Sequence, residues 1–480
     1  MADKRKEDLK NVLLVVLFIT TILFLYLLWS HDSSNSFSIL DILPGRWDDA
    51  DIPAIEEVTV PRYVAVSDGS GVFRLAEGDT ASVSGFASSL ITEACANSSV
   101  TVSEINEQQF SAVMSRYDSV QIALSCDVPF NDFVRYHSLR IGTQQDLIQS
   151  VSLIAFSDAS RESIFIYDAP QKRYFRLLVA NEYEFSEKIS ASCRLTSDSY
   201  YLSSEILGYG RALIPVNVQS QLAEKAFISD AASGGRELRT SMAEVVMGEN
   251  FDFVRRISDG FGNITYMYGY GQKSFTANAD GSFEYSSEVS GGSGGDFYED
   301  LRTAIVFIAR CGGWPQSEND EPSLVLDGAE SFSEGRLTGH RYYFSQFIDG
   351  VPVRSEDGYA AEIVISNGQV SYFKRCTIDA GAGQRAGRSQ AADAANVIAN
   401  NCNHIYNVLN NNTLVAATDE AFSFVSELIT DMRQGYFSSA RSGELMPCWI
   451  VRTSDGSEFY FDLYDASPLG FSRSEQYGLE

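Results

Sequence analysis

The sequence predicts an α+β protein in which a single N-terminal transmembrane helix is followed by a multi-domain extracytoplasmic region of antiparallel meander sheets covered by helices. Residues 12–29 form an uncharged apolar run. Beyond them, short segments alternate apolar and polar residues and are joined by turn pairs such as Asp-Gly, which is typical of hairpins. The 30 phenylalanines and 24 tyrosines favour strands as well.

The charge of the chain limits what it binds. Its 480 residues include 64 Asp and Glu against 36 Lys and Arg, a formal net charge of −28. A field of this sign repels nucleic acid and anionic lipid head groups, so we predict no nucleic-acid partner. None of the four histidines lies at a metal-ligand spacing from another, which argues against a zinc hydrolase.

The first element is the membrane anchor at residues 12–29, which read VLLVVLFITTILFLYLLW. This is about the length that crosses the hydrocarbon core as a helix. Lys4, Arg5, Lys6 and Lys10 precede it and aspartates follow it, so the positive-inside rule makes residues 1–11 a cytoplasmic tail and places the bulk of the chain outside the cell. Because SHDSSNS matches a cleavage site poorly, we expect an uncleaved anchor.

Within this helix, Tyr26 and Trp29 are expected at the outer interface, where amphipathic rings are favourable. The hydroxyls of Thr20 and Thr21 could bond to a neighbouring helix, although bonding to their own backbone is the commoner outcome. The residues that we predict for the membrane anchor and a possible helix contact are Val12, Val16, Thr20, Thr21, Phe24, Tyr26 and Trp29.

The outer region divides into four parts by composition and pattern. Residues 30–56 are rich in Ser and Asp and are expected to form a stalk. We predict an N-terminal α+β domain at residues 57–190, a middle β-rich domain at 197–288 and a C-terminal helix-plus-meander domain at 296–475. The sequence SGGSGGD at 290–296 is typical of a linker between the last two.

Alternation in the N-terminal domain predicts strands at 58–66, 119–126 and 150–158 and a hairpin over 162–180 that turns at 168–170. Residues 79–95 and 104–116 are predicted covering helices. In the middle domain, Asp280-Gly281 joins two aromatic-rich strands as a tight hairpin.

The C-terminal domain begins with a predicted helix at 296–310, whose apolar residues recur every three or four positions. A meander at 340–376 follows, with turn pairs at Asp349-Gly350, Asp357-Gly358 and Asn367-Gly368. Two more helices are predicted at 389–409 and 420–432, and a closing hairpin turns at Asp455-Gly456. Helix followed by meander thus occurs twice, which suggests a weak internal repeat.

Motifs with chemical meaning are weak in this chain. The glycine-rich residues 291–295 lack the lysine of a phosphate-binding loop. Ser371 and Lys374 have the spacing of an SxxK motif, but they alternate as a strand and would point to opposite faces. The acidic groups at 48–51 and 318–321 lack the spacing of a calcium loop. We therefore predict a protein that is not an enzyme, and we nominate no catalytic, cofactor-binding or metal-binding residue.

The seven cysteines are odd in number and widely spaced, so they do not form a disulfide framework. Several lie in apolar alternations, as Cys126 and Cys376 do. This favours buried reduced thiols, and one or two disulfide bridges are the alternative.

The layout resembles a known family, the YycH and YycI proteins, which accompany the essential cell-wall sensor kinase of Gram-positive bacteria. The resemblance covers nearly the whole chain: a short basic N-terminus, an anchor ending in LLW and a three-part outer region. Local likenesses are SVQIALSCDVPFNDF, SVSLIAFSD, the hairpin at Asp280-Gly281, FIDGVPV, VISNGQVSYFKR and LMPCWIVRTSDGSEFYF. Similar helix-plus-meander units occur in PepSY-type domains.

This resemblance implies a non-enzymatic regulator without a cofactor, anchored in the cell membrane. Its implied partners are a second single-pass regulator of the same family, met outside the cell, and a sensor histidine kinase that it modulates partly through its transmembrane helix. A different class remains open: an extracytoplasmic binding module or inhibitor for cell-wall fragments, peptides or wall enzymes.

Overall fold

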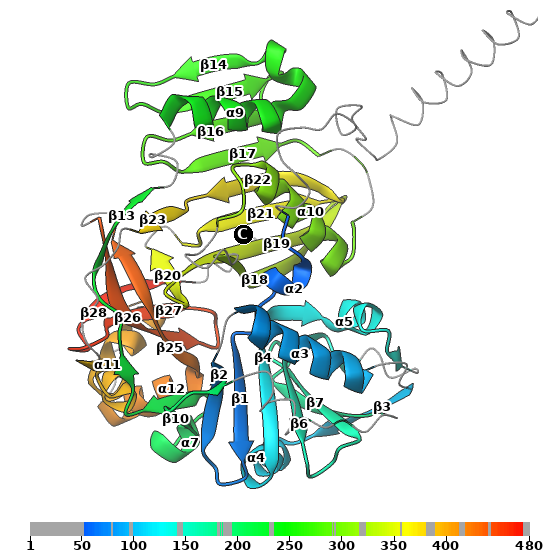
Figure 1. The fold of residues 1–480 in the computed structure, drawn as a ribbon, viewed down its shortest axis with the longest axis vertical. Helices are drawn as coiled ribbons and strands as arrows, with labels where there is room; N and C mark the ends of the chain where they lie inside the picture. The colour runs from blue at the N-terminus through cyan, green and yellow to red at the C-terminus, as the bar shows by residue number, and fades with distance from the viewer. Residues whose placement is uncertain are drawn as a thin grey trace, which may run out of the picture. The chain divides into compact units, whose positions relative to one another are not determined.

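The described part of the chain is built on two large, mostly antiparallel sheets with helices packed on them, as the computed structural model shows (Figure 1). The structure describes residues 52–77, 80–95, 99–141, 147–179, 183, 185, 194–229, 235–289, 291, 294–315, 323–355, 358–380, 389–411, 418–439 and 443–473. The expected α+β class is confirmed at this level, as a mixed fold with mostly antiparallel sheets.

The first sheet holds the strands of the N-terminal part of the chain. Its order is β11 (Leu213–Val216), β10 (Ser199–Leu202), β2 (Phe73–Glu77), β1 (Tyr63–Asp68), β4 (Asp118–Pro129), β6 (Ser150–Ser157), β7 (Ser163–Asp168), β8 (Arg173–Leu178), β3 (Ser99–Ile105) and β5 (Arg140–Ile141), with β9 (Arg194–Leu195) paired to β2. All described pairs in it are antiparallel except β3 with β5.

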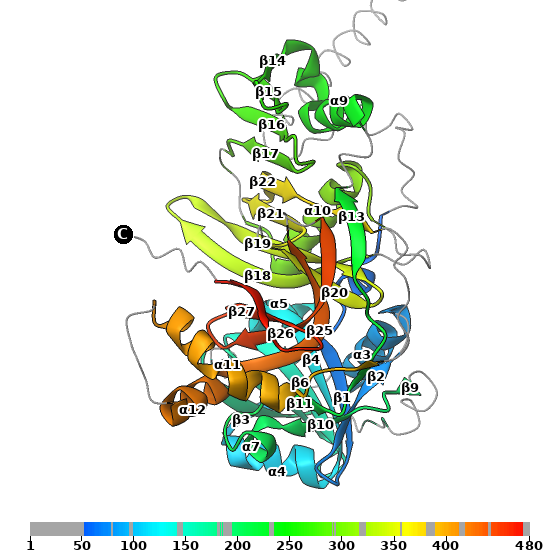
Figure 2. The same ribbon diagram turned by 90° about the vertical axis from the view of Figure 1, so that its left-hand side faces the viewer.

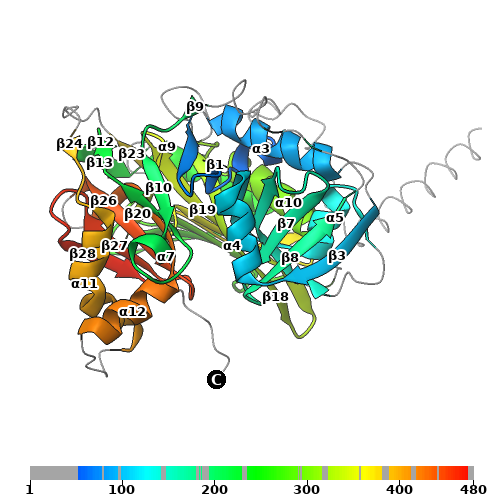
Figure 3. The same cartoon turned by 90° about the horizontal axis from the view of Figure 1, so that it is seen from below.

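Two helices cover opposite faces of this sheet and can be followed in Figure 3. From α3 (Thr80–Cys95), Phe86 and Leu90 pack with Ile154 of β6 in the main core. From α4 (Glu107–Arg116), Phe110 packs in a separate cluster with Ala155, the next residue of the same strand. Because successive strand residues point to opposite faces, the two helices lie on opposite sides, and both are where the sequence predicts a helix.

The second sheet runs from the middle of the chain to its C-terminal part. Its order is β14 (Arg255–Ser258), β15 (Ile264–Tyr268), β16 (Lys273–Ala277), β17 (Phe283–Ser287), β22 (Gln369–Arg375), β21 (Ala361–Ser366), β19 (Leu337–Ile348), β20 (Val351–Ser355), β25 (Ile429–Ser439), β26 (Glu444–Thr453), β13 (Lys225–Ser229) and β23 (Ile378–Ala380). Further strands pair beside this path: β18 (Leu324–Glu334) with β19, and β27 (Glu458–Asp462) with β26 and β28 (Pro468–Ser472). A separate pair is formed by β12 (Gln219–Ser220) and β24 (Ser389–Gln390).

The turn pairs set the register of this sheet as the sequence predicts. Asp349 and Asn367 have φ of 54° and 50°, and each is followed by a glycine with φ of 75°, which are the positive values that a tight two-residue hairpin requires. Gly281 and Gly456 also have positive φ, in the β16–β17 and β26–β27 turns. These four hairpins are confirmed, whereas Asp357 lies outside the described residues.

Helix α10 (Phe297–Arg310) packs on the second sheet with its predicted apolar stripe buried. The side chain of Asp296 accepts a hydrogen bond from the Glu299 N–H at 2.9 Å, which caps the helix N-terminus. Helix α9 (Gly235–Met247) contacts β16 and is continued by a 3₁₀ helix, η4 (Gly248–Phe253). The short helices α2 (Ile55–Val58) and α5 (Phe130–Tyr136) both contact α10.

One hydrophobic core joins the two sheets. It includes residues of α3 and the first sheet together with α10 and strands β16 to β19, β21 and β22. A second core is formed by residues of α11 (Ala394–Leu409), α12 (Thr418–Leu428) and strands β25 to β27, which lie together in Figure 2. It also includes Leu207, which directly follows α7 (Ser203–Ile206). Ile52–Glu480 forms one compact unit. The predicted middle domain contributes β10 and β11 to the first sheet and β14 to β17 to the second.

Two predicted helix boundaries are wrong. The helix expected at 389–409 begins at Ala394, because Asp393 caps it through the Asn396 N–H and Ser389 pairs with Ser220 as a strand. The helix expected at 420–432 ends at Leu428, because Ile429 already pairs with Thr453 of β26. In both places a strand pairing with a distant segment overrides local apolar periodicity.

The predicted anchor cannot be compared with the structure, because residues 12–29 and most of the stalk at 30–56 lie outside the described residues. None of the helices in the described ranges has the length and apolar character that crossing a bilayer requires.

Candidate binding cavity

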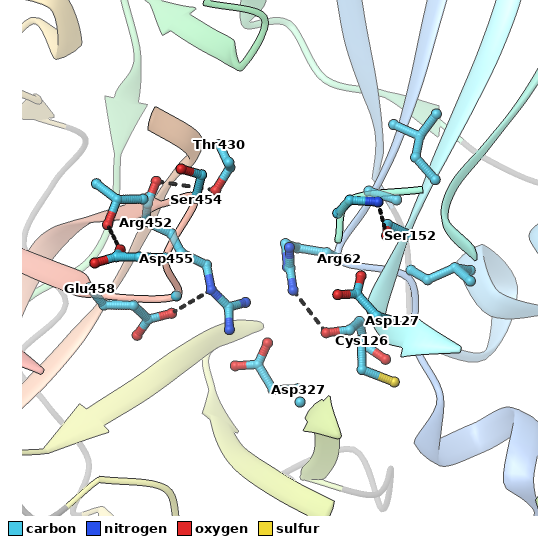
Figure 4. A pocket seen from close by; sticks show the side chains of 18 of the residues that line it. Arg62, Cys126, Asp127, Ser152, Asp327, Thr430, Arg452, Ser454, Asp455 and Glu458 are labelled. Carbon is cyan, nitrogen blue, oxygen red and sulfur yellow. Dashed lines mark hydrogen bonds and ion pairs between the residues drawn. The ribbon is translucent and has the colours of Figure 1, made fainter. Parts of the chain in front are cut away.

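A cavity of about 870 Å³ lies outside the cores, and both sheets contribute walls to it (Figure 4). Strands β1, β4, β6, β7 and β8 line one side, and β18 to β22 with β25 to β28 line the other. This volume is in the range that holds a small organic ligand.

Charged side chains dominate the lining. Its basic residues are Arg62, Lys172, Arg211, Arg341, Arg354, Lys374, Arg452 and Arg473. Its acidic residues are Asp127, Asp327, Glu330, Glu362, Asp455 and Glu458. The lining is therefore net positive, whereas the whole chain carries −28.

Three irregularities in strand pairing place polar groups in the cavity. In β18 the register shifts between Leu326 and Gly328, so Asp327 is the extra residue, and in β25 the shift leaves Thr430 unpaired. Between β4 and β6 the pairing is interrupted from Ala123 to Val128, and the residues in between line the cavity. Such bulges turn a side chain away from its regular direction and are frequent beside functional sites.

Arg354 is at the centre of the buried charges. Its Nε lies 2.6 Å from Glu458 Oε2, its Nη2 contacts Asp327 Oδ2, and its Nη1 donates to Ser345 Oγ at 2.7 Å. The Ser345 hydroxyl donates in turn to Asp327 Oδ2 at 2.8 Å. Arg354, Asp327 and Glu458 are each at most 4% exposed, so this group is a buried, mutually compensated ionic network.

Strand packing fixes Arg354 in this position. Strand β20 pairs in parallel with β25, which sets Arg354 beside Phe437. A Cβ on Gly435 would lie 2.8 Å from the Pro352 carbonyl oxygen and would also collide with the Ile450 side chain. Only glycine therefore lets β25 approach β20 and β26 at this point.

Two further arginines extend the network. Arg433 Nη2 lies 3.3 Å from Asp327 Oδ1, and Arg433 Nε lies 3.4 Å from Asp431 Oδ2. Arg452 Nε lies 3.8 Å from Glu458 Oε1, across the β26–β27 hairpin in which the two residues are direct partners.

These arginines keep the buried carboxylates ionised. Burial alone would raise the pKa of Asp327, but the guanidinium groups led by Arg354 and Arg433 hold its pKa well below the ordinary value. Burial likewise acts to raise the pKa of Glu458, and Arg354 and Arg452 lower it. The carboxylates are therefore committed to neighbouring arginines.

Arg62 approaches the network from the first sheet. Its Nη2 donates to the Ser125 carbonyl oxygen at 2.8 Å, and its guanidinium points toward that of Arg452 with Asp327 beside both (Figure 4). Burial, and then repulsion by Arg452, lower the pKa of Arg62. Arg62 Nε and Arg452 Nη1 are buried and have no hydrogen-bond partner within the described part of the chain. Two donors on facing arginines are thus left unsatisfied.

Aromatic rings border the charged centre on both sides. Tyr343 and Tyr359 pack with ring centroids 4.8 Å apart on the side of the second sheet. On the other side Tyr167 and Tyr174 are also 4.8 Å apart, and Arg211 donates to both of their hydroxyls. The cavity therefore combines a cationic centre with flat apolar walls.

The thiol in the wall is not a nucleophile. Cys126 lines the cavity, but burial raises its pKa to about 12, so it stays protonated at neutral pH. The described free and buried cysteines are Cys95, Cys126, Cys311, Cys402 and Cys448, which confirms the prediction of buried reduced thiols for these five. Cys376 is only half-buried, and Cys193 lies outside the described ranges.

A buried histidine–aspartate pair lies away from the cavity. His340 Nδ1 on β19 is 2.7 Å from Asp300 Oδ2 on α10, and the two side chains are 9% and 2% exposed. The His340 ring packs edge to face on Phe297 with centroids 5.6 Å apart. Neither Asp300 nor His340 lines the cavity.

The predicted site residues cannot be compared with this cavity. Val12, Val16, Thr20, Thr21, Phe24, Tyr26 and Trp29 lie outside the described residues. Ser371 and Lys374 lie on β22 as predicted, and Ser371 bonds to Ser366 Oγ at 2.8 Å. Within the described ranges, no group of three His, Cys, Asp or Glu side chains is arranged to hold a metal ion.

Sequence reasoning missed the charged network altogether. One signal was present: Arg452 and Glu458 stand three residues before and after Asp455, so an opposite-charge pair flanks the turn of an otherwise apolar hairpin, and the structure pairs the two residues directly. Asp327 and Arg62 carry no comparable local signal.

Comparisons with known proteins found no matching family model, no matching curated protein and no matching solved structure.

Proposed function

We propose that this chain is a non-enzymatic, membrane-anchored regulator of the kind that the YycH and YycI proteins represent. Its outer region, with PepSY-like units in the C-terminal part, associates with a second single-pass regulator outside the cell. The pair modulates a sensor histidine kinase that controls cell-wall metabolism, partly through the helix at residues 12–29. The proposal rests on the anchor, on the resemblance and on one surface of the described fold.

That surface is the β14 end of the second sheet, and it carries the proposal of a protein partner. All four residues of β14 are exposed, and in the described part of the chain β14 pairs with a strand on one side only. Phe253, Phe261 and Tyr270 near this edge are 78%, 87% and 106% exposed. A bare strand edge with large exposed rings is costly in water and is a common place for another chain to bind.

A cellular assay of kinase output tests the proposal. The phosphorylated fraction of the response regulator is measured in cells that lack this chain and in cells that carry the double variant Phe261→Ser and Tyr270→Ser. We expect both to shift kinase output in the same direction, because the variant removes the rings that would bury on association. Replacing residues 12–29 with an unrelated membrane helix should also reduce the effect.

The matched control is Tyr117→Ser, which removes an exposed ring, at 50% exposure, from the surface at the start of β4. It should leave kinase output at the wild-type level. If deletion of the whole chain leaves output unchanged, the regulator proposal is wrong. If deletion acts but the double variant behaves like the control, the β14 end is not the contact surface.

The cavity favours a second candidate function, an extracytoplasmic binding module. The 870 Å³ volume and the unsatisfied arginine donors support it. A binding module and a regulator are compatible, since a bound ligand would contact both sheets at once.

A further inference from the structure

We propose that the cavity binds a small organic ligand through an oxyanion, a carboxylate or a phosphate, which is held between Arg62 and Arg452. The inference rests on the binding-module candidate above and deepens it by naming the chemical class of the ligand. It is independent of the kinase, so direct binding measurements can fail or succeed separately from the kinase assay.

The first support is the positive net charge of the side chains that line the cavity. The chain has 64 acidic and 36 basic residues and a net charge of −28, whereas the cavity lining holds more basic than acidic side chains. Low-dielectric walls concentrate such a local potential. The cavity is therefore an electropositive exception, and an anion is the ligand that it attracts.

The second support is that the arginines differ in how many of their N–H groups have an acceptor. Arg354 uses its donors on Asp327, Glu458 and Ser345. Arg62 and Arg452 instead face each other, and one buried N–H of each lacks an acceptor in the described part of the chain. A buried donor without a partner costs about 1–3 kcal/mol, and like charges in proximity add to that cost.

An oxyanion between the two guanidinium groups removes both costs. Its oxygens accept from the unsatisfied N–H groups, and its negative charge offsets the repulsion between the arginines. Guanidinium groups suit this task, because their fixed fork of donors matches the geometry of carboxylate and phosphate.

The size and the walls describe the rest of the ligand. An oxyanion alone fills a small part of 870 Å³. The Tyr343–Tyr359 and Tyr167–Tyr174 pairs present flat apolar surface on opposite sides, which suits a ring or a short apolar chain attached to the anion. The ligand class is thus a small amphiphilic acid rather than a free inorganic ion.

Binding is measured by isothermal titration calorimetry on the full-length protein in detergent. The probes are inorganic phosphate, N-acetylalanine and N-acetylalanine amide; the last keeps the carrier and lacks the charge. We expect phosphate or N-acetylalanine to bind and the amide to bind at least tenfold more weakly. The anion that binds more tightly shows whether the ligand's oxyanion is a phosphate or a carboxylate.

Arg62→Gln and Arg452→Gln are the test variants. Each should weaken anion binding roughly 10- to 100-fold, the range for a lost hydrogen bond to a charged group. Lys172→Gln is the matched control, because it removes a cation from the exposed rim of the same cavity, and it should change affinity less than threefold.

Two outcomes overturn the inference: neither anion binds the wild-type protein, or binding survives unchanged in folded Arg62→Gln and Arg452→Gln. Because Arg452 also lies near Glu458, its variant could misfold. In that event Arg62→Gln, which sacrifices one hydrogen bond to a backbone carbonyl, decides alone. Loss of kinase control with anion binding intact would count against the regulator proposal only.

Discussion

The protein contains two buried polar sites that differ in how fully their polar groups are paired. The Asp300–His340 pair joins α10 to β19, and His340 Nδ1 lies 2.7 Å from Asp300 Oδ2. The network around the cavity sets four guanidinium groups, those of Arg62, Arg354, Arg433 and Arg452, against the carboxylates of Asp327, Asp431 and Glu458. The first site is closed, whereas the second has a surplus of cations at a cavity.

This difference distinguishes a site that stabilises the fold from a site that can bind a ligand. A closed pair has no capacity for a further ligand, and its disruption affects stability alone. An open cluster retains unsatisfied donors that only a ligand can use, and natural proteins accept such local costs at functional sites. The same difference is found within the network. Arg354 donates to acceptors of the protein, whereas Arg62 and Arg452 each keep one N–H group without an acceptor in the described part of the chain.

The largest expected change in the free energy of unfolding comes from removing Arg354, whose donors all have acceptors in the network. Arg354→Met should lower the free energy of unfolding by about 3–5 kcal/mol, because it leaves Asp327 and Glu458 buried with too few partners. Denaturant unfolding of the full-length protein, followed by circular dichroism, measures it.

Arg173→Met is the control for this variant. Arg173 pairs with Glu104 on the surface, so its loss should not measurably change stability. Equal effects of Arg354→Met and Arg173→Met would mean that the buried network does not stabilise the fold.

The elements that carry the network explain why the sequence did not reveal it. Hairpins with a two-residue turn, such as β21–β22 with its Asn367-Gly368 pair, could be predicted with their register, because the positive φ values required at the turn are indicated by two adjacent residues. Strand β18, which carries Asp327, lies before the predicted meander, and the helix predicted at 420–432 overlaps the first part of β25. The bulges at Asp327 and Thr430 depend on pairing with distant strands, which a local pattern does not encode.

Arg62 shows the same limit more strongly. It lies just before β1 in the first sheet, and Arg452 lies at the end of β26 in the second. Their proximity follows from how the two sheets pack through the shared core, not from any spacing in the chain. In contrast, α10 with its Asp296 cap and buried stripe was predictable from one continuous segment.

The closed pair supplies a prediction of intermediate size. His340→Phe keeps a ring against Phe297 but removes the partner of the Asp300 carboxylate. Unfolding should become easier by about 1–3 kcal/mol, with anion affinity unchanged. The double variant Asp300→Leu and His340→Phe should recover most of this loss, since replacing both partners leaves no buried polar group behind. A change in anion binding by His340→Phe would show that the two sites are coupled and would break the comparison.

The smallest expected effect on stability belongs to the open arginine. Arg62→Gln loses the hydrogen bond to the Ser125 carbonyl oxygen, but it also removes a buried unsatisfied N–H and the repulsion between Arg62 and Arg452. These contributions oppose each other, so the free energy of unfolding should change by no more than about 1 kcal/mol.

The same variant should nevertheless lose the stabilisation that an anion gives. A ligand that binds only the folded state raises the free energy of unfolding as its concentration exceeds the dissociation constant. Adding phosphate or N-acetylalanine should therefore raise the melting temperature of the wild-type protein and of Lys172→Gln, but hardly that of Arg62→Gln. A large loss of stability in Arg62→Gln without ligand would instead place Arg62 with Arg354 in the closed part of the network. The facing arginines would then hold the two sheets together rather than wait for an anion.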